Sequence, residues 1–138
     1  MKTKITVTSI DHDEMVDLLS TALEGSNWFG ADYDRDIYKT LEDTTGDCFE
    51  DKLADMLMAG HKITITDYEA EGESYSNKCT KITADGYVVY KVGLEDFLKV
   101  ASTKTGFKLL NEVLDGTGDY YTADAFLQRV VFGEEIYG

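Results

Sequence analysis

Hydrophobic residues recur most regularly between positions 10 and 29. They are spaced three or four residues apart, as on one face of an α-helix: Met15, Val16, Leu18, Leu19, Ala22 and Leu23. Asp11 and Glu14 precede this stripe with the spacing of a capping box, and Gly25 follows it where a left-handed residue often ends a helix. The pattern predicts a helix whose central part runs from Met15 to Glu24.

Apolar and polar residues alternate in several shorter segments, which is the pattern of half-buried strands. Strands are predicted at residues 2–10, 62–69, 75–83 and 87–92. The dipeptide Asp85-Gly86 lies between the last two segments and favours a tight hairpin turn. The segments after residue 60 therefore predict an antiparallel meander.

Helical spacing also returns further along the chain. One region begins at Asp47 and Glu50, which have the spacing of a second capping box, and ends at Gly60. Another begins at Leu94 and is interrupted at residues 102–106, where small and polar residues gather. We expect a helix in each region.

The last helix is predicted from Ala123 to Phe132, with Thr122 as its cap and Gly133 at its end. No linker, repeat or low-complexity stretch divides the chain. The sequence therefore predicts one α+β domain over residues 1–138, with a small antiparallel sheet packed against about four helices.

Trp28 and Phe29 stand side by side in a glycine-rich turn after the first helix. Large aromatic residues in such a turn usually pack back on the helix that precedes them. We therefore expect Trp28 to cover the core, together with Leu19 and the last helix. An exposed binding platform is the less favoured alternative.

Residues 31–45 follow neither period clearly. Asp32, Asp34 and Asp36 have the spacing of the first three ligands of a calcium-binding loop, but Ile37 stands where that loop needs glycine and Asp43 where it needs glutamate. An acidic edge interleaved with apolar residues is the better interpretation. We predict no metal site.

The charge of the chain is strongly acidic and unevenly distributed. The formal net charge is −14, and residues 11–55 hold fourteen Asp or Glu against three Lys or Arg. Such a field repels nucleic acid and anionic membranes and attracts basic protein surfaces. We therefore expect a partner protein with a basic surface, no direct binding of nucleic acid and no membrane association.

Other features of composition limit the cellular setting. No apolar stretch has the length of a membrane span, and no signal peptide is evident. Cys48 and Cys79 are isolated in sequence, which favours free thiols over a disulfide framework or a zinc site. We expect a cytoplasmic protein.

Signatures of catalysis are weak. The two histidines, His12 and His61, lie in no nucleophile–base pattern, and no phosphate-binding loop or metalloprotease motif is present. We predict no catalytic residues and no cofactor, and we expect a protein that is not an enzyme.

Two blocks at the ends of the chain carry a resemblance. They are residues 22–28 (ALEGSNW) and residues 128–138 (QRVVFGEEIYG). Together they resemble uncharacterised small proteins of bacterial prophages and other mobile elements, mostly from gut Firmicutes and Bacteroidetes. Ser26, Phe29 and Arg129 depart from the usual pattern. The resemblance implies an accessory phage protein in a bacterial host cell, and it suggests that the two ends pack together.

Two functions are compatible with these features. The first is an acidic inhibitor of a host nucleic-acid-handling or defence protein, in which carboxylates imitate phosphates: Asp32, Asp34, Asp36, Glu42 and Asp43. This hypothesis requires carboxylates on one continuous face. An ordinary acidic protein, whose charge serves solubility, fits the same composition.

The alternative is a small-molecule or nucleotide-binding protein that sequesters a defence signal. Its pocket residues would be Asn27, Trp28, Tyr33 and Arg129, which offer stacking and polar contacts. The scarcity of clustered Lys and Arg weakens the case for a phosphate-bearing ligand. A homo-oligomer is compatible with the sequence under either hypothesis.

Overall fold

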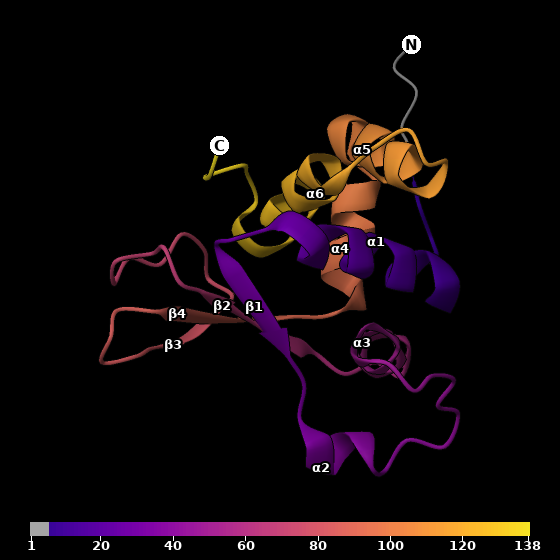
Figure 1. Cartoon of the computed structure of the whole chain (residues 1–138), viewed down its shortest axis with the longest axis horizontal. Coiled ribbons are helices and arrows are strands. Elements are labelled where there is room, and N and C mark those ends of the chain that lie inside the picture. The colour runs from indigo at the N-terminus through magenta and orange to yellow at the C-terminus, as the bar shows by residue number, and fades with distance from the viewer. Residues whose placement is uncertain (1–5) are drawn as a thin grey trace.

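The computed structural model of the chain describes residues 6–138. These residues form an α+β domain with a four-stranded antiparallel sheet. Figure 1 shows α1, α4, α5 and α6 gathered beyond one end of the sheet, with α3 beneath them and α2 set apart from the body. In chain order the elements are α1 (His12–Gly25), β1 (Phe29–Asp32), α2 (Arg35–Tyr38), α3 (Phe49–Met58), β2 (Ile63–Asp67), β3 (Cys79–Ile82), β4 (Val88–Val92), α4 (Leu94–Ala101), α5 (Lys104–Leu114) and α6 (Tyr120–Phe132).

Helix α1 begins as its sequence predicts, but the prediction for its end is wrong: Gly25 is the last helical residue, without a positive φ, and the extended Ser26 follows it. The Asp11 carboxylate accepts the Glu14 N–H at 2.8 Å, and the Glu14 carboxylate accepts the Asp11 N–H at 3.0 Å. This pair satisfies two backbone donors that a helix start leaves free. The apolar stripe is buried against α3, α5 and α6, which confirms the predicted helix over Met15–Glu24.

The sheet is antiparallel as predicted, but its strand order is β1-β2-β4-β3, so the predicted meander is wrong: β2 pairs with β4, and β3 lies at the edge beyond β4. Strands β2, β3 and β4 lie within the predicted segments, and the chain reverses between β3 and β4 at Gly86, whose φ of 86° suits glycine. Strand β1 was not predicted, because its sequence Phe-Gly-Ala-Asp has little strand propensity. Strand β1 is stabilised by its antiparallel pairing with β2, which runs from Phe29 opposite Asp67 to Asp32 opposite Thr64 and compensates for this low propensity.

The strand predicted at residues 2–10 is wrong in its described part. Residues 6–10 form no strand, and residues 2–5 lie outside the described part of the chain. Instead, the Val7 N–H donates to the Ser102 hydroxyl at 2.9 Å, and Ile10 is buried in the core. Val7 therefore lies at the α4–α5 junction, and residues 6–10 pair with no strand of the described chain.

Two predicted helix caps are also wrong. Cys48, not Asp47, is the N-cap of α3, and no side chain bonds the first turn. Helix α6 begins at Tyr120 because the Asp119 carboxylate accepts the N–H groups of Tyr121 and Thr122. A carboxylate placed one residue before the helix satisfies these donors, so that Thr122 lies within the first turn and is not a cap.

The predicted break at residues 102–106 is confirmed. Helix α4 ends at Ala101, and the Thr103 hydroxyl accepts the Gly106 N–H at 3.0 Å to begin α5. A Cβ atom at Gly106 would collide with the carbonyl oxygen of Val100, so glycine is required where the two helices meet. This separation of α4 from α5, together with the single-turn α2, gives six described helices in place of about four.

Trp28 lies in the core, as predicted. Its side chain is 4% exposed and packs with Phe29 and Phe132, at ring-centroid distances of 4.7 and 5.0 Å. Helices α1 and α6 also contact each other extensively. The first and last helices and Trp28 therefore share one hydrophobic core.

Replacing Leu19 with alanine is expected to lower the free energy of unfolding by about 2–5 kcal/mol, because the side chain is 1% exposed and its loss leaves a cavity. Urea denaturation measures this change. Leu23→Ala, on the same helix but only half-buried, should cost clearly less. Equal losses for the two variants would place Leu19 outside the tightly packed core.

Candidate binding site

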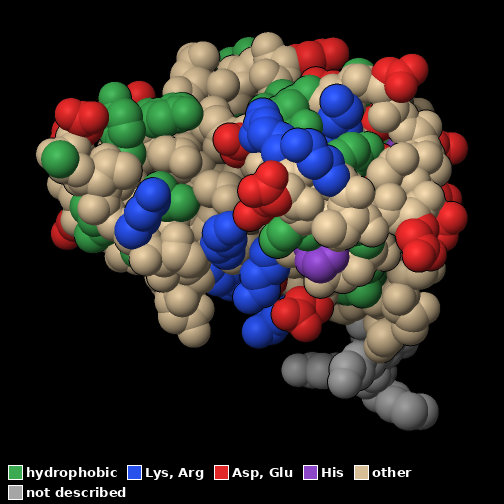
Figure 2. Space-filling model, turned by 90° about the horizontal axis from the view of Figure 1, so that it is seen from below, with side chains coloured by type: hydrophobic (Ala, Val, Ile, Leu, Met, Phe, Trp, Pro, Cys, Tyr) green, Lys and Arg blue, Asp and Glu red, His purple; other side chains and the backbone are tan. Residues whose placement is uncertain are grey.

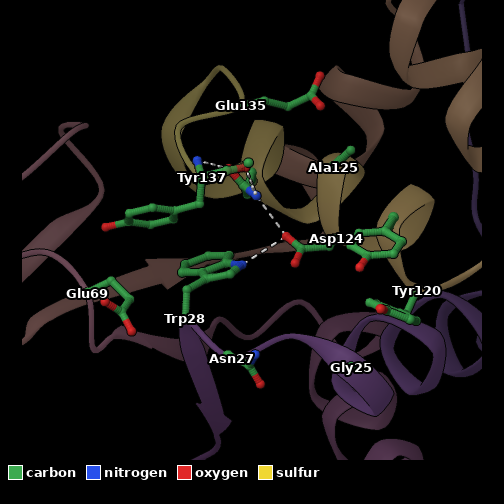
Figure 3. Close-up of a pocket in the computed structure, with 12 residues that line it drawn as sticks. Gly25, Asn27, Trp28, Glu69, Tyr120, Asp124, Ala125, Glu135 and Tyr137 are labelled. Atoms are coloured by element: carbon green, nitrogen blue, oxygen red, sulfur yellow. Dashed lines mark hydrogen bonds between the residues drawn. The ribbon is translucent and has the colours of Figure 1, made fainter.

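The end blocks of the chain meet around the Trp28 side chain. Trp28 follows α1, whereas Phe132 and Tyr137 belong to the end of α6 and to the tail after it. The Tyr137 ring lies 5.6 Å from the Trp28 ring, and the two rings are tilted by 37° (Figure 3). Residues 22–28 and 128–138 therefore pack together, as the joint occurrence of the two blocks suggests.

Asp124 joins these segments through its carboxylate. Oδ1 accepts the Trp28 indole N–H at 2.8 Å and the Gln128 side-chain N–H at 2.8 Å (Figure 3). Oδ2 accepts the Ser26 hydroxyl at 2.8 Å. All three donors are neutral groups. They hold the carboxylate in one orientation without cancelling its charge.

The Gln128 side chain holds the C-terminal tail against α6. Its Oε1 accepts the backbone N–H groups of Ile136 and Tyr137 at 2.7 and 2.8 Å, and its Nε2 donates to the Tyr137 carbonyl at 3.1 Å. Gln128 is 3% exposed, so these bonds satisfy an amide that would otherwise be costly to bury. The tail is thereby fixed at the edge of the site.

Tyr137 also reaches the sheet. Its hydroxyl donates to Asp67 Oδ2 at 2.7 Å, and the Glu69 N–H donates to Asp67 Oδ1 at 2.9 Å. Asp67 is fully buried, and burial raises the pKa of its carboxyl although both hydrogen bonds favour the charged form. Burial and the Asp67 carboxylate together raise the pKa of the Tyr137 hydroxyl, which keeps it a hydrogen-bond donor.

A half-open cavity of about 590 Å³ lies over this network. A volume of this size is within the usual range for small-molecule sites, about 300–1,000 Å³. At one wall the Tyr120 ring packs so closely on Gly25 that a Cβ atom there would clash with it. The lining residues are Gly25, Asn27, Trp28, Glu69, Tyr120, Tyr121, Asp124, Ala125, Gln128, Glu135, Tyr137 and Gly138, none of which is Lys or Arg.

The four residues proposed from the sequence as a ligand pocket do not share one cavity. Asn27 and Trp28 line the cavity above. Tyr33 lies elsewhere, 5.4 Å from the Tyr38 ring, because β1 carries the chain away from Trp28. Arg129 pairs with Glu135 at 2.7 Å and lines a smaller cavity beside α4. Gln128, which precedes Arg129 on α6, lines the larger cavity, so these two successive residues line different cavities.

The five carboxylates proposed to bind a partner are all exposed: Asp32, Asp34, Asp36, Glu42 and Asp43. They belong to residues 32–47, which hold six acidic and two basic residues and which we call the acidic arm. Figure 1 shows α2, which lies in the first half of this arm, standing away from the other helices.

Two of these carboxylates have structural partners. Burial opposes ionisation of Asp32, but hydrogen bonds from Arg35 and from the Tyr33 N–H outweigh it and lower the pKa of the carboxyl. Asp34 caps α2 by accepting the N–H groups of Asp36 and Ile37 at 2.9 and 3.1 Å. The arm is therefore partly ordered by the residues that give it its charge.

Asp55 attaches the acidic arm to α3. Its buried carboxylate accepts the Tyr38 hydroxyl at 2.9 Å and the Thr45 hydroxyl at 2.9 Å, and lies 3.0 Å from Nε2 of His12. Sequence reasoning missed this group, although Asp55 is a charged residue within the apolar helical pattern of α3. A second cavity, of about 440 Å³, is lined by Asp55, both histidines and two of the proposed carboxylates, Glu42 and Asp43.

The arrangement around His12 does not form a catalytic relay. Such a relay places the hydroxyl and the carboxylate on opposite nitrogens of the imidazole. Here Nε2 faces both the Thr45 hydroxyl, at 2.8 Å, and the Asp55 carboxylate, whereas the fully exposed Asp13 carboxylate lies 3.6 Å from Nδ1, beyond hydrogen-bond distance. The Thr45 hydroxyl donates to Asp55, so this carboxylate organises the arm and does not orient a base.

Charge on the face from which α2 projects is mixed. In Figure 2, which views the molecule from below, Lys and Arg side chains gather in the middle, with Asp and Glu among them and toward the right-hand rim. The carboxylates on this face are not a continuous layer. A local acidic segment fits this distribution better than imitation of a long nucleic-acid duplex does.

Comparison of the chain with models of protein families, with curated proteins and with solved structures found no match. Within residues 6–138, no helix has both the length and the apolar character needed to cross a membrane. Nor does this part of the chain contain a group of three or more His, Cys, Asp or Glu side chains suited to hold a metal ion.

Replacing Asp124 with alanine is expected to lower the free energy of unfolding by about 2–4 kcal/mol, because three donors lose their acceptor in a partly buried place. Ser26→Ala removes only one donor and should cost about 1 kcal/mol. Chemical denaturation of both variants checks this order. Losses of equal size would show that Asp124 does not join the two ends.

Stability should also depend on pH through Asp67. Its native pKa is raised above the ordinary 3.8, so between the two values the folded chain binds more protons than the unfolded chain. The contribution of Asp67 to the unfolding free energy therefore rises as pH falls from neutrality and is complete below its ordinary pKa. As the pH falls from 7 to about 4, the parent protein should therefore gain stability relative to the Asp67→Asn variant. A constant difference, measured by denaturation across this range, would contradict the prediction.

Proposed function

We propose that this protein is a non-enzymatic accessory protein of a phage or mobile element that inhibits a host defence or nucleic-acid-handling protein. The acidic arm would bind a basic surface on that host protein. The main support is the exposure of all five arm carboxylates, on a segment whose helix α2 is set apart from the other helices (Figure 1). The resemblance of the two end blocks supplies the phage setting and the cytoplasm of a bacterial cell.

The arm also has the mixed composition that protein interfaces favour. Ile37 in the arm and Phe49 at the start of α3 are each 36% exposed, and the Tyr33 ring of the arm lies 5.9 Å from the Phe49 ring. Apolar and aromatic residues surrounded by charge are typical of binding surfaces, where the apolar centre supplies affinity and the rim supplies orientation. The arm is therefore suited to contact a folded protein.

Charge in the arm would act chiefly on the rate of association. Carboxylates that are exposed to water are screened by salt and contribute little affinity pair by pair. A dense group of them attracts an oppositely charged surface over a distance and accelerates encounter by about tenfold to a thousandfold. Binding of the host protein should therefore weaken as ionic strength rises.

Neutralising the arm tests this proposal. The triple variant Asp32→Asn, Asp34→Asn and Asp36→Asn keeps a good helix cap at position 34 but removes three charges. We expect it to associate with the host protein about tenfold more slowly at low salt, with a nearly unchanged melting temperature. Partners retained from a host lysate can be identified by mass spectrometry and then measured individually.

A matched control removes the same charge elsewhere. Glu71→Gln, Glu73→Gln and Asp85→Asn alter exposed residues at two turns, which adjoin because the Gly72 N–H donates to the Gly86 carbonyl at 2.8 Å. This control should bind the host protein as the parent does. Both the parent and the control should also displace nucleic acid from the host protein in a direct competition experiment. If the arm variant and the control behave alike at low and high salt, the arm is not the binding surface.

A further inference from the structure

The cavity between α1, α6 and the tail has an unusual balance of charge. Three of its lining residues are acidic and none is basic. Glu135 is paired with Arg129, but among the described residues no Lys or Arg lies within ion-pair distance of Glu69 or Asp124. Two carboxylates without a cationic partner therefore face one half-enclosed space.

Asp124 is the more constrained of the two. Its three hydrogen bonds come from an indole, an amide and a hydroxyl, so its charge is fixed in position and not neutralised. Figure 3 shows Asp124 on one side of the Trp28 ring and Glu69 on the other. Because solvent is partly excluded from a cavity, such fixed charges attract a cation more strongly there than on an open surface.

Aromatic rings form much of the remaining wall. The Tyr120 and Tyr121 rings lie 4.1 Å apart at a tilt of 33°, and Figure 3 shows Trp28 and Tyr137 across from Tyr120. The faces of Trp and Tyr rings carry partial negative charge and attract ammonium groups within about 6 Å. Carboxylates and aromatic rings together are a recurrent means of binding organic cations.

We propose that this cavity binds an organic cation, specifically an ammonium group carried on an aliphatic chain. The lining lacks the Lys and Arg that phosphates require, which disfavours a nucleotide. Within the described chain no group of acidic, Cys or His side chains is suited to hold a metal ion, and the cavity is much larger than an ion needs. The same chemistry is found in a free polyamine and in a lysine side chain of a protein. This inference does not depend on the function proposed for the acidic arm.

The chain contains its own probe for the test. Trp28 is the only tryptophan, and it lines the cavity. Titration with spermidine, or with the blocked lysine Nα-acetyl-lysine N-methylamide, should change Trp28 fluorescence along a saturable curve. Magnesium chloride at equal ionic strength and adenosine monophosphate should leave it unchanged. Calorimetry on the same samples gives the stoichiometry.

Variants locate the bound cation. Glu69 and Tyr121 are exposed lining residues, the latter by 63%, so Glu69→Gln and Tyr121→Ala should fold normally. Each should weaken amine binding by about fivefold or more. The acidic-arm triple variant removes more charge at another place and should bind the amine within about twofold of the parent, because salt screens distant charges.

The outcomes distinguish the sources of the cation. Saturation by spermidine alone supports a free polyamine, and saturation by the blocked lysine supports a partner side chain. A fluorescence change that does not saturate would show only diffuse electrostatic attraction of the amine and would overturn the proposal. Equal weakening of amine binding in the arm variant and in the cavity variants would do the same. Binding of adenosine monophosphate in place of the amines would overturn it as well. Neither result would bear on the acidic arm, whose partner is measured separately.

Discussion

The hydrogen bond from the Trp28 indole to Asp124 is the interaction on which the organisation of this end of the molecule depends. It fixes the chain where α1 leads into β1, and it fixes the face of α6 from which Gln128 holds the tail. Segments about a hundred positions apart in sequence therefore share one carboxylate. Because the loss of this acceptor would leave an indole, an amide and a hydroxyl unsatisfied together, the arrangement tolerates little change at position 124.

This network continues into the sheet and sets the form of the cavity. The Tyr137 backbone N–H donates to the Gln128 amide, and the Tyr137 hydroxyl donates to Asp67, whose carboxylate is buried under the tail. No buried side-chain nitrogen or oxygen within residues 6–138 lacks a hydrogen-bond partner. A fully satisfied polar network is rigid, since any displacement breaks several bonds at once. The inner wall of the cavity is therefore held in place by these bonds, which would reduce the entropic cost of binding a ligand against it; this wall consists of Trp28, Asp124, Gln128 and Tyr137.

Sequence reasoning succeeded where structure follows from neighbouring residues and failed where it follows from distant ones. The period of Met15–Leu23 and the alternation of residues 63–67 determine α1 and β2, and both were predicted. Strand β1 exists because β2 pairs with it, and Asp119 caps α6 from a position that the pattern did not single out. Asp124 was missed for a similar reason. Its partners Ser26 and Trp28 are distant, and only its spacing of four residues from Gln128 is visible locally.

Carboxylates of the acidic arm and of the cavity differ in how they are held, and this difference matters more than their number. Asp36, Glu42 and Asp43 are exposed to solvent, so the effect that we propose for them on a partner is long-ranged and easily screened by salt. Asp124 is held by three neutral donors beside aromatic rings, so its effect is short-ranged and directional. The first arrangement can accelerate encounter with many basic surfaces, whereas the second can select one chemical group. Net charge alone therefore does not indicate which residues confer specificity in this protein; the hydrogen bonds that immobilise a carboxylate do.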